Sequence, residues 1–299
     1  MLVPTYFPKF KCIAARCGHS CCIGWEIGVD EDTLQTYRAL KGEMGHAIRQ
    51  GLVEDDEGTT LRLDERERCV HLDERGLCRI ISTLGEEYLC EICREHPRFY
   101  HRAGGHMEGG IGASCEEAAR LILAEEDYVT MVSPDGAPAE ITPQTGAEFD
   151  AFAGRTALYA VLSDKALSYG ERRRRVAKDY ALPRALSNEA LRALLGELEY
   201  FDEAHLPLLQ AAVTAPEAKV PEAERFLAYL VYRHASPAEN EREFRCGVSL
   251  ALLLEALLCR LVGGAGLSPV EAARTLSLEL EYSEENTEAL RFALEMENL

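Results

Sequence analysis

The sequence is poor in basic residues. Its 299 residues include 32 lysines and arginines against 51 aspartates and glutamates, which gives a net charge of −19. Proteins that bind nucleic acid need a basic surface for the phosphates, so this charge argues against a nucleic-acid partner. An acidic surface attracts basic partners such as lysine-bearing proteins, and it also keeps a protein soluble. Composition alone favours the simpler role, solubility.

The sequence also lacks the signals of secretion and membrane insertion. Its first residues, MLVPTYFPKFKC, contain no basic segment followed by an apolar one, as a secretory signal peptide would. The longest apolar run covers residues 248–262. Ser249, Glu255 and Arg260 interrupt this run, which is too short and too charged for a membrane span. We therefore expect a cytoplasmic protein without a membrane partner, in which the run forms a buried helix.

Cysteine is abundant but unevenly distributed. Two of the 11 cysteines, Cys246 and Cys259, lie in a predicted core helix, where we expect them to pack as apolar side chains. The other nine cysteines all lie between Cys12 and Cys115. Such a dense group of thiols is typical of a soft metal site, an iron–sulfur cluster or disulfides. The nine clustered cysteines are Cys12, Cys17, Cys21, Cys22, Cys69, Cys78, Cys90, Cys93 and Cys115.

Disulfides are the least favoured of these three interpretations. The number of cysteines is odd, and nothing at the N-terminus indicates an oxidising compartment. A chain of 299 residues is also long enough to build its own core without covalent cross-links. We therefore predict that ligands of a metal or of a cluster are among the nine clustered cysteines.

Two pairs of cysteines are spaced so that their thiols converge. Cys90 and Cys93 stand three residues apart in a helix predicted over residues 84–92, which places both thiols on one face. Cys69 and Cys78 lie on either side of a predicted tight turn. Each pair is expected to direct two sulfur atoms toward a single metal centre.

Cys115 stands at the start of another predicted helix. Ser114 and Glu117 have the spacing of a capping box, so Cys115 is expected in the first helical turn. Backbone amides and the helix dipole at that position would lower the pKa of the thiol and favour the thiolate.

The spacings alone do not choose between zinc and iron–sulfur. Zinc needs four ligands, and His19, His71 or His96 could complete a zinc site. Nine thiols would allow two zinc sites, or one four-cysteine cluster with spare structural thiols. Which four cysteines are ligands stays open.

The pattern predicts a mainly α protein with two domains. A cysteine-rich, metal-binding domain is expected over residues 1–130, and a helical domain over residues 146–299 packs against it. A segment rich in proline, glycine and threonine, residues 133–145, connects the two. One amphipathic helix of the second domain is indicated by apolar residues at helical spacing, namely Leu191, Leu194, Leu195, Leu198 and Phe201.

Three further helices are predicted from their capping residues. Ser236 and Ser268 each precede a proline and a glutamate, which is typical of a helix start, and the first of these helices is expected to stop at Gly263-Gly264. A last helix is expected from about Ser283. Its side chains expected to face inward are Leu290, Phe292 and Leu294.

Two other features are given structural roles. The run Arg172–Arg175 would spread around a helix, so a solvated surface is favoured over an anion site. Trp25, the only tryptophan, follows the adjacent cysteine pair and is interpreted as an apolar cover over the metal site.

The cysteine blocks resemble the flagellin lysine N-methylase family. The resemblance lies in FKCIAARCGHSCCIGWEIGVD (residues 10–30), CVHLDERGLCRIISTLGEEYLCEICREHPRFY (residues 69–100) and SCEEAARLIL (residues 114–123). The motif CC-x-G-W, the run LG-x2-Y-x-C-x2-CR-x-HPR and the order of the cysteines make it specific. The same region shares features with cysteine-rich families described as zinc- or iron-chelating. The helical remainder matches only in general character.

The resemblance implies a bacterial methyltransferase. It would transfer methyl from S-adenosylmethionine to lysine ε-amines of flagellin or of another lysine-bearing protein, with an iron–sulfur cluster, 4Fe-4S, held by the cysteines and zinc as the alternative metal. The sequence departs from the usual radical S-adenosylmethionine motif C-x3-C-x2-C, because Cys22 follows Cys21 directly. No G-x-G-x-x-G follows a clear strand, so a Rossmann-type methyltransferase is not expected.

Methyl transfer to an amine is an ordinary nucleophilic displacement. It needs a neutral lysine, whose reference pKa is about 10.4, a base or a desolvated pocket, and an aligned sulfonium. The sequence identifies neither the base nor the donor pocket. The alternative function, from a different class, is a non-catalytic zinc- or iron-binding scaffold whose helical domain binds a partner.

Overall fold

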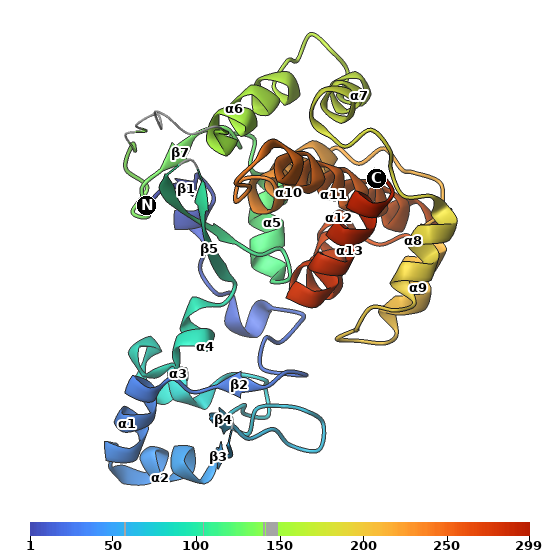
Figure 1. Cartoon of the computed structure of the whole chain (residues 1–299). Helices are drawn as coiled ribbons and strands as arrows, with labels where there is room; N and C mark the ends of the chain where they lie inside the picture. Colours follow the sequence, from blue (N-terminus) through green and yellow to red (C-terminus); the bar gives the residue numbers. More distant parts are fainter. Residues whose placement is uncertain (57, 104, 140, 142–148) are drawn as a thin grey trace. The chain divides into compact units, whose positions relative to one another are not determined.

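The computed structural model describes residues 1–56, 58–103, 105–139, 141 and 149–299. Their contacts divide the chain into two compact units (Figure 1). Residues 11–98 form the first, called here the cysteine unit, and residues 1–10 together with 99–299 form the second, called the helical unit. Thirteen α-helices occur among the described residues, which confirms the mainly α class.

The cysteine unit combines short helices with a small antiparallel sheet. The sheet has the strand order β2-β4-β3, with Ile27 opposite Leu61 and Val53 opposite Thr60. In chain order the elements are η2 (Ala14–Arg16), β2 (Ile27–Gly28), α1 (Glu31–Ala39), α2 (Gly42–Gln50), β3 (Leu52–Glu54), β4 (Thr59–Leu61), α3 (Arg79–Leu84), η3 (Glu86–Tyr88) and α4 (Glu91–Glu95).

Asp30 organises two helix starts in the cysteine unit. One carboxylate oxygen accepts the Thr33 N–H at 3.0 Å and caps α1, and the other accepts the Glu91 N–H at 2.8 Å at the start of α4. A carboxylate at a helix N-terminus satisfies backbone donors that have no partner within the helix. One side chain therefore fixes the segment before Glu31 to the segment that carries Cys90.

The prediction of one helix over residues 84–92 is wrong. The α3 helix ends at Leu84, Gly85 adopts a φ of +111°, and a short 3-10 helix precedes α4. Glycine reaches this backbone conformation without the steric cost that other residues pay, so the chain turns there. Cys90 is consequently the residue that precedes α4, while Cys93 lies within it.

The helical unit contains the remaining elements. A hairpin of two strands, a pair of short strands near the N-terminus and a set of helices make up this unit (Figure 1). The elements are β1 (Val3–Pro4), η1 (Phe7–Lys9), β5 (Arg98–Ala103), β6 (His106–Ile111), α5 (Glu116–Ala124), β7 (Met131–Val132), α6 (Ala151–Leu162), α7 (Tyr169–Tyr180), α8 (Asn188–Leu195), α9 (His205–Ala212), α10 (Ala223–His234), α11 (Glu241–Arg260), η4 (Leu261–Ala265), α12 (Pro269–Leu276), η5 (Ser277–Glu281) and α13 (Glu284–Met296).

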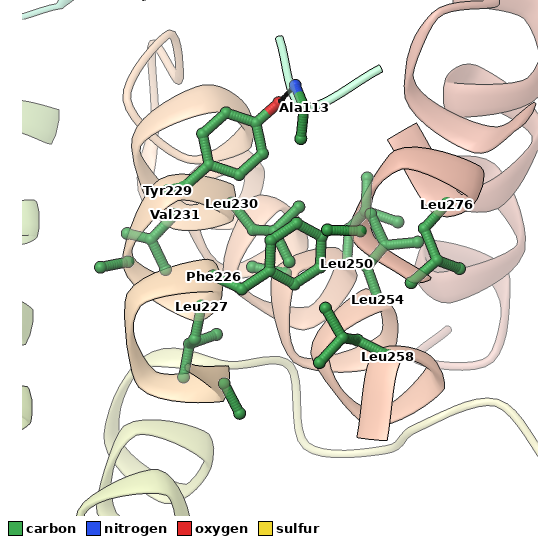
Figure 2. Close-up of a cluster of buried hydrophobic side chains, with 14 of the residues drawn as sticks. Ala113, Phe226, Leu227, Tyr229, Leu230, Val231, Leu250, Leu254, Leu258 and Leu276 are labelled. Carbon is green, nitrogen blue, oxygen red and sulfur yellow. Dashed lines mark hydrogen bonds between the residues drawn. The ribbon is translucent and has the colours of Figure 1, made fainter. Parts of the chain in front are cut away.

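Helices α10 and α11 form the centre of the helical core. Figure 2 shows Phe226 and Leu230 of α10 beside Leu254 and Leu258 of α11, with Leu276 of α12 close to them. All five side chains are completely buried. The Ala113 N–H donates to the Tyr229 hydroxyl at 3.1 Å, so the segment before α5 is joined to this core (Figure 2).

The α11 helix has the length and apolar composition of a membrane span. The stretch Glu241–Ala265 is 25 residues long and its most apolar 18-residue window has a mean hydropathy of 1.9, but 72% of that window is buried inside the protein. A core helix of a soluble protein passes the same test. The expected buried helix over residues 248–262 therefore lies within α11 and η4, where its apolar side chains meet other helices.

The boundaries of the units differ from the division expected near residue 130. Residues 99–124 pack with the helical unit because the β5–β6 hairpin and α5 contribute side chains such as Ile111, Ala118 and Ile122 to its core. Within the predicted connector, residues 140 and 142–145 lie outside the described residues, as do residues 146–148 at the start of the predicted helical domain.

The predicted helix starts have mixed outcomes. Ser268 and Ser283 do cap helices: their hydroxyls accept the N–H groups of Glu271 and Asn286, each at 3.1 Å. The start at Ser236 is wrong, because Asn240 caps α11. The end predicted for this helix at Gly263-Gly264 is also wrong.

The α11 helix continues through one π-helical turn across Gly263-Gly264. It ends at Gly266, where φ is +69°. The predicted amphipathic helix over Leu191–Phe201 is shorter than expected, since α8 ends at Leu195 and Phe201 is exposed.

The arginine run in α7 is not a purely solvated surface. The Arg172 side chain is buried and forms an ion pair with Glu224 at 2.7 Å. Arg173 forms an ion pair at 2.5 Å with Glu255, whose side chain is almost completely buried. Glu224 of α10 and Glu255 of α11 thus pair with two arginines of the run on the side of α7 that faces the core. Helical periodicity within α7 alone could not indicate these pairs.

Glu108 and Arg155 form the most deeply buried ion pair of the helical unit. The two guanidinium nitrogens donate to the two carboxylate oxygens at 2.6 and 2.7 Å, and the pair is 2% and 0% exposed. Arg155 also donates to the Ser236 hydroxyl at 2.5 Å and lies over the rings of Phe152 and Tyr232. Burial raises the pKa of Glu108, but the hydrogen bonds from Arg155 and His101 reverse this and lower it overall.

We predict that the substitution Arg155→Met destabilises the helical unit strongly. It leaves the Glu108 carboxylate buried without its partner, which typically costs about 3–5 kcal/mol of the free energy of unfolding. The measurement is urea unfolding followed by far-UV circular dichroism. Arg120→Met is the control, because that arginine is 57% exposed in its pair with Glu117 and should cost at most about 1 kcal/mol. Equal losses for the two variants would contradict the prediction.

Candidate metal centre

Backbone contacts bring the cysteine blocks of the cysteine unit together. The Cys69 N–H donates to the Cys22 carbonyl at 2.9 Å, which joins the first block to the second. Cys69 and Cys90 are 5% and 1% exposed and belong to one apolar cluster. Cys22, Cys78 and Cys93 are partly buried against the same cluster. Residues separated by up to about seventy positions in the sequence therefore share one small core.

Four of the thiols form two hydrogen-bonded pairs. A hydrogen bond from Cys22 lowers the pKa of Cys21 to about 7, against the opposing effect of burial. The same hydrogen bond, together with burial, raises the pKa of Cys22. Cys90 and Cys93 behave alike: the hydrogen bond between them lowers the pKa of Cys90 and raises that of Cys93. In each pair one sulfur favours the thiolate and the other keeps its proton.

The thiols also interact across the pairs. After burial, which is the main cause, neighbouring thiolates raise the pKa of Cys69, to about 11, and that of Cys78. Cys21 and Cys22 likewise oppose ionisation of Cys93. Each of these sulfurs therefore lies within electrostatic reach of others. The set, called here the thiol cluster, consists of Cys21, Cys22, Cys69, Cys78, Cys90 and Cys93.

The thiol cluster supplies soft donors but not a finished coordination site. Among the described residues, no three His, Cys, Asp or Glu side chains are placed as they would be around a metal ion. Thiolate sulfur is nevertheless the preferred donor for zinc and for iron–sulfur clusters. A bound cation would also remove the repulsion that adjacent thiolates exert on one another. The donor chemistry of these residues therefore fits such a group.

The other three predicted ligands are placed differently. Cys12 is exposed, and its sulfur accepts the Ala14 N–H at 3.4 Å within a local turn. Cys17 is half-buried. Cys115 belongs to the helical unit, not to the cysteine unit. The structure thus brings six of the nine predicted cysteines together, and the part that each plays as a ligand stays a prediction.

The capping box predicted for Cys115 is not formed. Cys115 itself is the residue preceding α5, and no side chain caps that helix. The Glu117 carboxylate pairs with Arg120 instead, at 2.6 and 2.7 Å. Arg120, one turn further along the helix, therefore binds the Glu117 carboxylate that the capping box would have used.

Two of the three histidines named as possible zinc ligands are uncharged at neutral pH. Burial lowers the pKa of both His71 and His96 to about 4, and Arg79 and Arg62 add to the effect on His71. The His71 Nε2 is buried and has no hydrogen-bond partner among the described residues. This atom faces Gly51, where an added Cβ would lie 2.6 Å from it. A neutral imidazole can bind a metal, but His71 is packed against backbone in this arrangement.

Trp25 packs against the same apolar cluster as the thiols. Its indole N–H donates to the Cys21 carbonyl at 2.7 Å, and its ring lies 6.4 Å from that of His96, centre to centre. The sole tryptophan thereby joins the first cysteine block to the segment after α4. Its interpretation as a cover over a metal stays a prediction.

An open cavity of about 340 Å³ reaches the thiol cluster at Cys69. Arg68 lines it, and the buried Nε of this arginine has no hydrogen-bond partner. The carboxylates of Asp64 and Asp73 accept backbone N–H groups of their own turns, at Arg66 and Leu77 respectively. Cys69, which is 5% exposed, therefore lies at the wall of this cavity.

Cys246 and Cys259 are core residues, as expected. They are 0% and 6% exposed, and burial raises the pKa of their thiols to about 11 and about 12. Both thiols stay protonated at neutral pH, which suits an apolar packing role.

Three histidine–glutamate pairs in the helical unit were not indicated by the sequence. The distances between ring nitrogen and carboxylate oxygen are 3.1, 2.6 and 2.7 Å. Two of these pairs join residues far apart in the chain, so local spacing carried no signal for them. Paired histidines of this kind can move protons, although here the glutamates are buried and two also bind arginine. The pairs are His101 with Glu108, His205 with Glu279 and His234 with Glu281.

We predict that the reduced, metal-free cysteine unit loses stability as the pH falls from about 6.5 to about 4. Over this range His71 and His96 bind protons in the unfolded chain but not in the folded chain. Proton binding lowers the free energy of the unfolded state relative to that of the folded state, so the free energy of unfolding decreases. His71 alone would account for roughly 3 kcal/mol at the lower limit. The measurement is urea unfolding monitored by the fluorescence of Trp25, which lies in this unit.

The matched variants are His71→Gln and His46→Gln. The first should reduce the dependence of stability on pH, whereas the second, at an exposed position, should leave it unchanged. A pH dependence that survives the substitution of His71 in full would assign the effect to other groups.

Comparison with known proteins gives few but consistent matches. No family model matches the chain, and no solved structure is significantly similar to it. The chain is 28% identical over 134 residues to a protein of Salmonella typhimurium named lysine-N-methylase, and equally similar to the flagellar biosynthetic protein FliU of Salmonella muenchen. Each alignment covers 43% of this chain, with 33% of the lysine-N-methylase and 79% of FliU. The resemblance to flagellin lysine N-methylases indicated by the cysteine motifs is therefore confirmed, for a chain that aligns with a third of that enzyme's length.

Proposed function

We propose that this chain acts as a protein-lysine N-methylase, transferring methyl from S-adenosylmethionine to lysine ε-amines of flagellin or another lysine-bearing protein. The observation that carries the proposal is the alignment with lysine-N-methylase and FliU over 43% of the chain. The net charge of −19 supports it, because an acidic surface attracts a lysine-bearing substrate. The reaction would take place in the bacterial cytoplasm.

We propose further that four members of the thiol cluster hold an iron–sulfur cluster of the 4Fe-4S type, with zinc as the alternative. Two observations support this: five of the six thiols share one small core, with Cys21 exposed beside Cys22, and adjacent thiolates raise one another's pKa. The bound group would supply positive centres that stabilise several thiolates at once. Burial of Cys69 and Cys90 and partial burial of Cys93 would protect these sulfurs from oxidation.

The proposed reaction is a displacement at carbon. The lone pair of the neutral lysine nitrogen attacks the sulfonium methyl carbon, and the carbon–sulfur bond breaks with its electron pair remaining on sulfur. The nitrogen then releases a proton to a base or to water. The sulfur becomes a neutral thioether, so charge and atoms balance without a radical or an added electron.

One observation favours the alternative, a non-catalytic metal-binding scaffold. The chain aligns with only 33% of the lysine-N-methylase but with 79% of FliU, whose name refers to flagellar biosynthesis rather than to methylation. In that case zinc or iron would stabilise the cysteine unit, and the helical unit would bind a partner. Metal content and methyl transfer separate the two functions.

We expect anaerobically purified protein to contain iron and acid-labile sulfide in similar amounts and to absorb visible light. The substitutions Cys69→Ser and Cys90→Ser should remove most of the iron, because each deletes a buried member of the thiol cluster. Cys259→Ser should keep it, since that thiol is a packing residue of the helical unit. Colourless wild-type protein with zinc as its only metal would sink the iron–sulfur assignment.

Methyl transfer is tested separately with labelled S-adenosylmethionine and purified flagellin. The expected result is label in lysine side chains, with loss of labelling in the Cys69→Ser and Cys90→Ser variants. A protein that binds iron but neither binds the donor nor labels flagellin would support the scaffold function instead.

A further inference from the structure

The outer side of helix α13 is apolar and exposed. Phe292, Met296 and Leu299 are 67%, 50% and 76% exposed. The spacing of four residues places Phe292 and Met296 in one stripe along the helix, and Leu299 follows in the turn after the end of the helix at Met296. Phe292 was expected to face inward, and the structure corrects this: Leu290 and Leu294 fill the core, and Phe292 lies a half-turn away from them. Large exposed apolar side chains that cluster in this way mark interaction sites.

The stripe belongs to a firmly held helix. Ser283 caps its start, and the Asn286 side chain donates to the carbonyls of Glu199 and Glu279 at 2.6 and 2.7 Å. The last turn is fixed by Asn298, which accepts the Arg184 N–H and donates to the Arg184 carbonyl, both at 2.8 Å. The exposure of the stripe is therefore a property of the folded helix.

Glutamates accompany the apolar stripe. Glu285 and Glu288 are exposed and lie on the same side of the helix, since they precede Phe292 by seven and four residues. The single basic residue of α13, Arg291, donates to the His234 carbonyl within the helical unit. The surface formed by Glu285, Glu288, Phe292, Met296 and Leu299, called here the α13 outer face, thus combines apolar and acidic side chains.

The end of α13 adds to the negative potential. Its last turn contains no basic residue, whereas Glu295 and Glu297 lie there. Cations are the charges that stabilise a helix C-terminus, because the helix dipole has its negative end there. In the part of the chain that the structure describes, Glu295 forms an ion pair with Arg242 at 3.2 Å, and no ion pair is found for Glu297. A positively charged partner would therefore be favoured both by the glutamates and by the helix end.

We infer that the α13 outer face binds a cationic amphipathic helix. The apolar side of the partner packs on Phe292, Met296 and Leu299, and its lysines or arginines pair with Glu285 and Glu288. The spacing of the stripe matches helix-on-helix recognition, in which anchors recur every three to four residues. A second copy of this chain is a poorer occupant, because it would place the same glutamates opposite these. The inference goes beyond the proposed function, since such binding needs neither metal nor methyl donor.

The test uses a fluorescent peptide of leucine and lysine whose leucines recur at helical spacing. Its binding to the full chain is followed by fluorescence anisotropy. The double substitution Phe292→Ser and Met296→Ser should weaken binding by about tenfold or more, because exposed apolar anchors carry much of the affinity in such contacts. The exposed control Val129→Ser should bind as the wild type does. Urea unfolding of each variant should match that of the wild type, since none of these side chains is in the core.

Charge is tested with Glu285→Lys and Glu288→Lys together. This pair should weaken binding and reduce its dependence on salt, while a peptide of the same composition with scattered leucines should bind weakly to all proteins. Unchanged affinity after loss of Phe292 and Met296 would overturn the inference. So would sedimentation showing that the wild type dimerises through this face, with the double serine variant monomeric.

Discussion

Repulsion among closely spaced thiolates is the constraint on which the cysteine unit depends. Five sulfurs share a small core and that of Cys21 lies beside them, and the six cannot all ionise without raising one another's pKa. Two solutions exist physically: the thiols keep protons and pair by hydrogen bonds, as Cys21 with Cys22 and Cys90 with Cys93 do, or a cation neutralises them. The short helices and the three-stranded sheet give this unit little apolar core with which to oppose that repulsion, so its stability is expected to follow the state of the sulfurs.

The helical unit is stabilised in a different way. Its core is a continuous set of apolar side chains centred on α10 and α11 (Figure 2). Several glutamates lie inside it, and each is satisfied by arginine, lysine, histidine or tyrosine, as with Glu108 and Arg155 or Glu224 and Arg172. Such pairs add little net stability but make the arrangement specific, because losing one partner leaves a buried charge. The stability of this unit is therefore expected to come from apolar burial and from paired charges.

The two units are suited to different parts of the proposed function. The cysteine unit presents a set of soft sulfur donors with an open cavity beside Cys69. The helical unit offers a rigid support and, on α13, an acidic and apolar surface for a partner. An enzyme that modifies lysines of another protein needs both a cofactor site and a means of holding a basic substrate. A metal-binding scaffold would need the same two features, which is why donor binding and methyl transfer, rather than architecture, distinguish the two functions.

The sequence by itself determined the features that depend on neighbours within a turn or two of helix. Short segments sufficed for the caps at Ser268 and Ser283, the mainly α class, the packing role of Cys246 and Cys259 and the family resemblance. Only the tertiary structure decided which cysteines gather, that Cys115 belongs to the other unit, that Arg172 is buried and that Phe292 is exposed. The reason is physical: burial and charge pairing are set by segments far apart in the chain, such as α7 with α10. A periodic pattern shows only that a helix has an apolar and a polar side. Phe292 shows that an apolar residue can also lie on the exposed side.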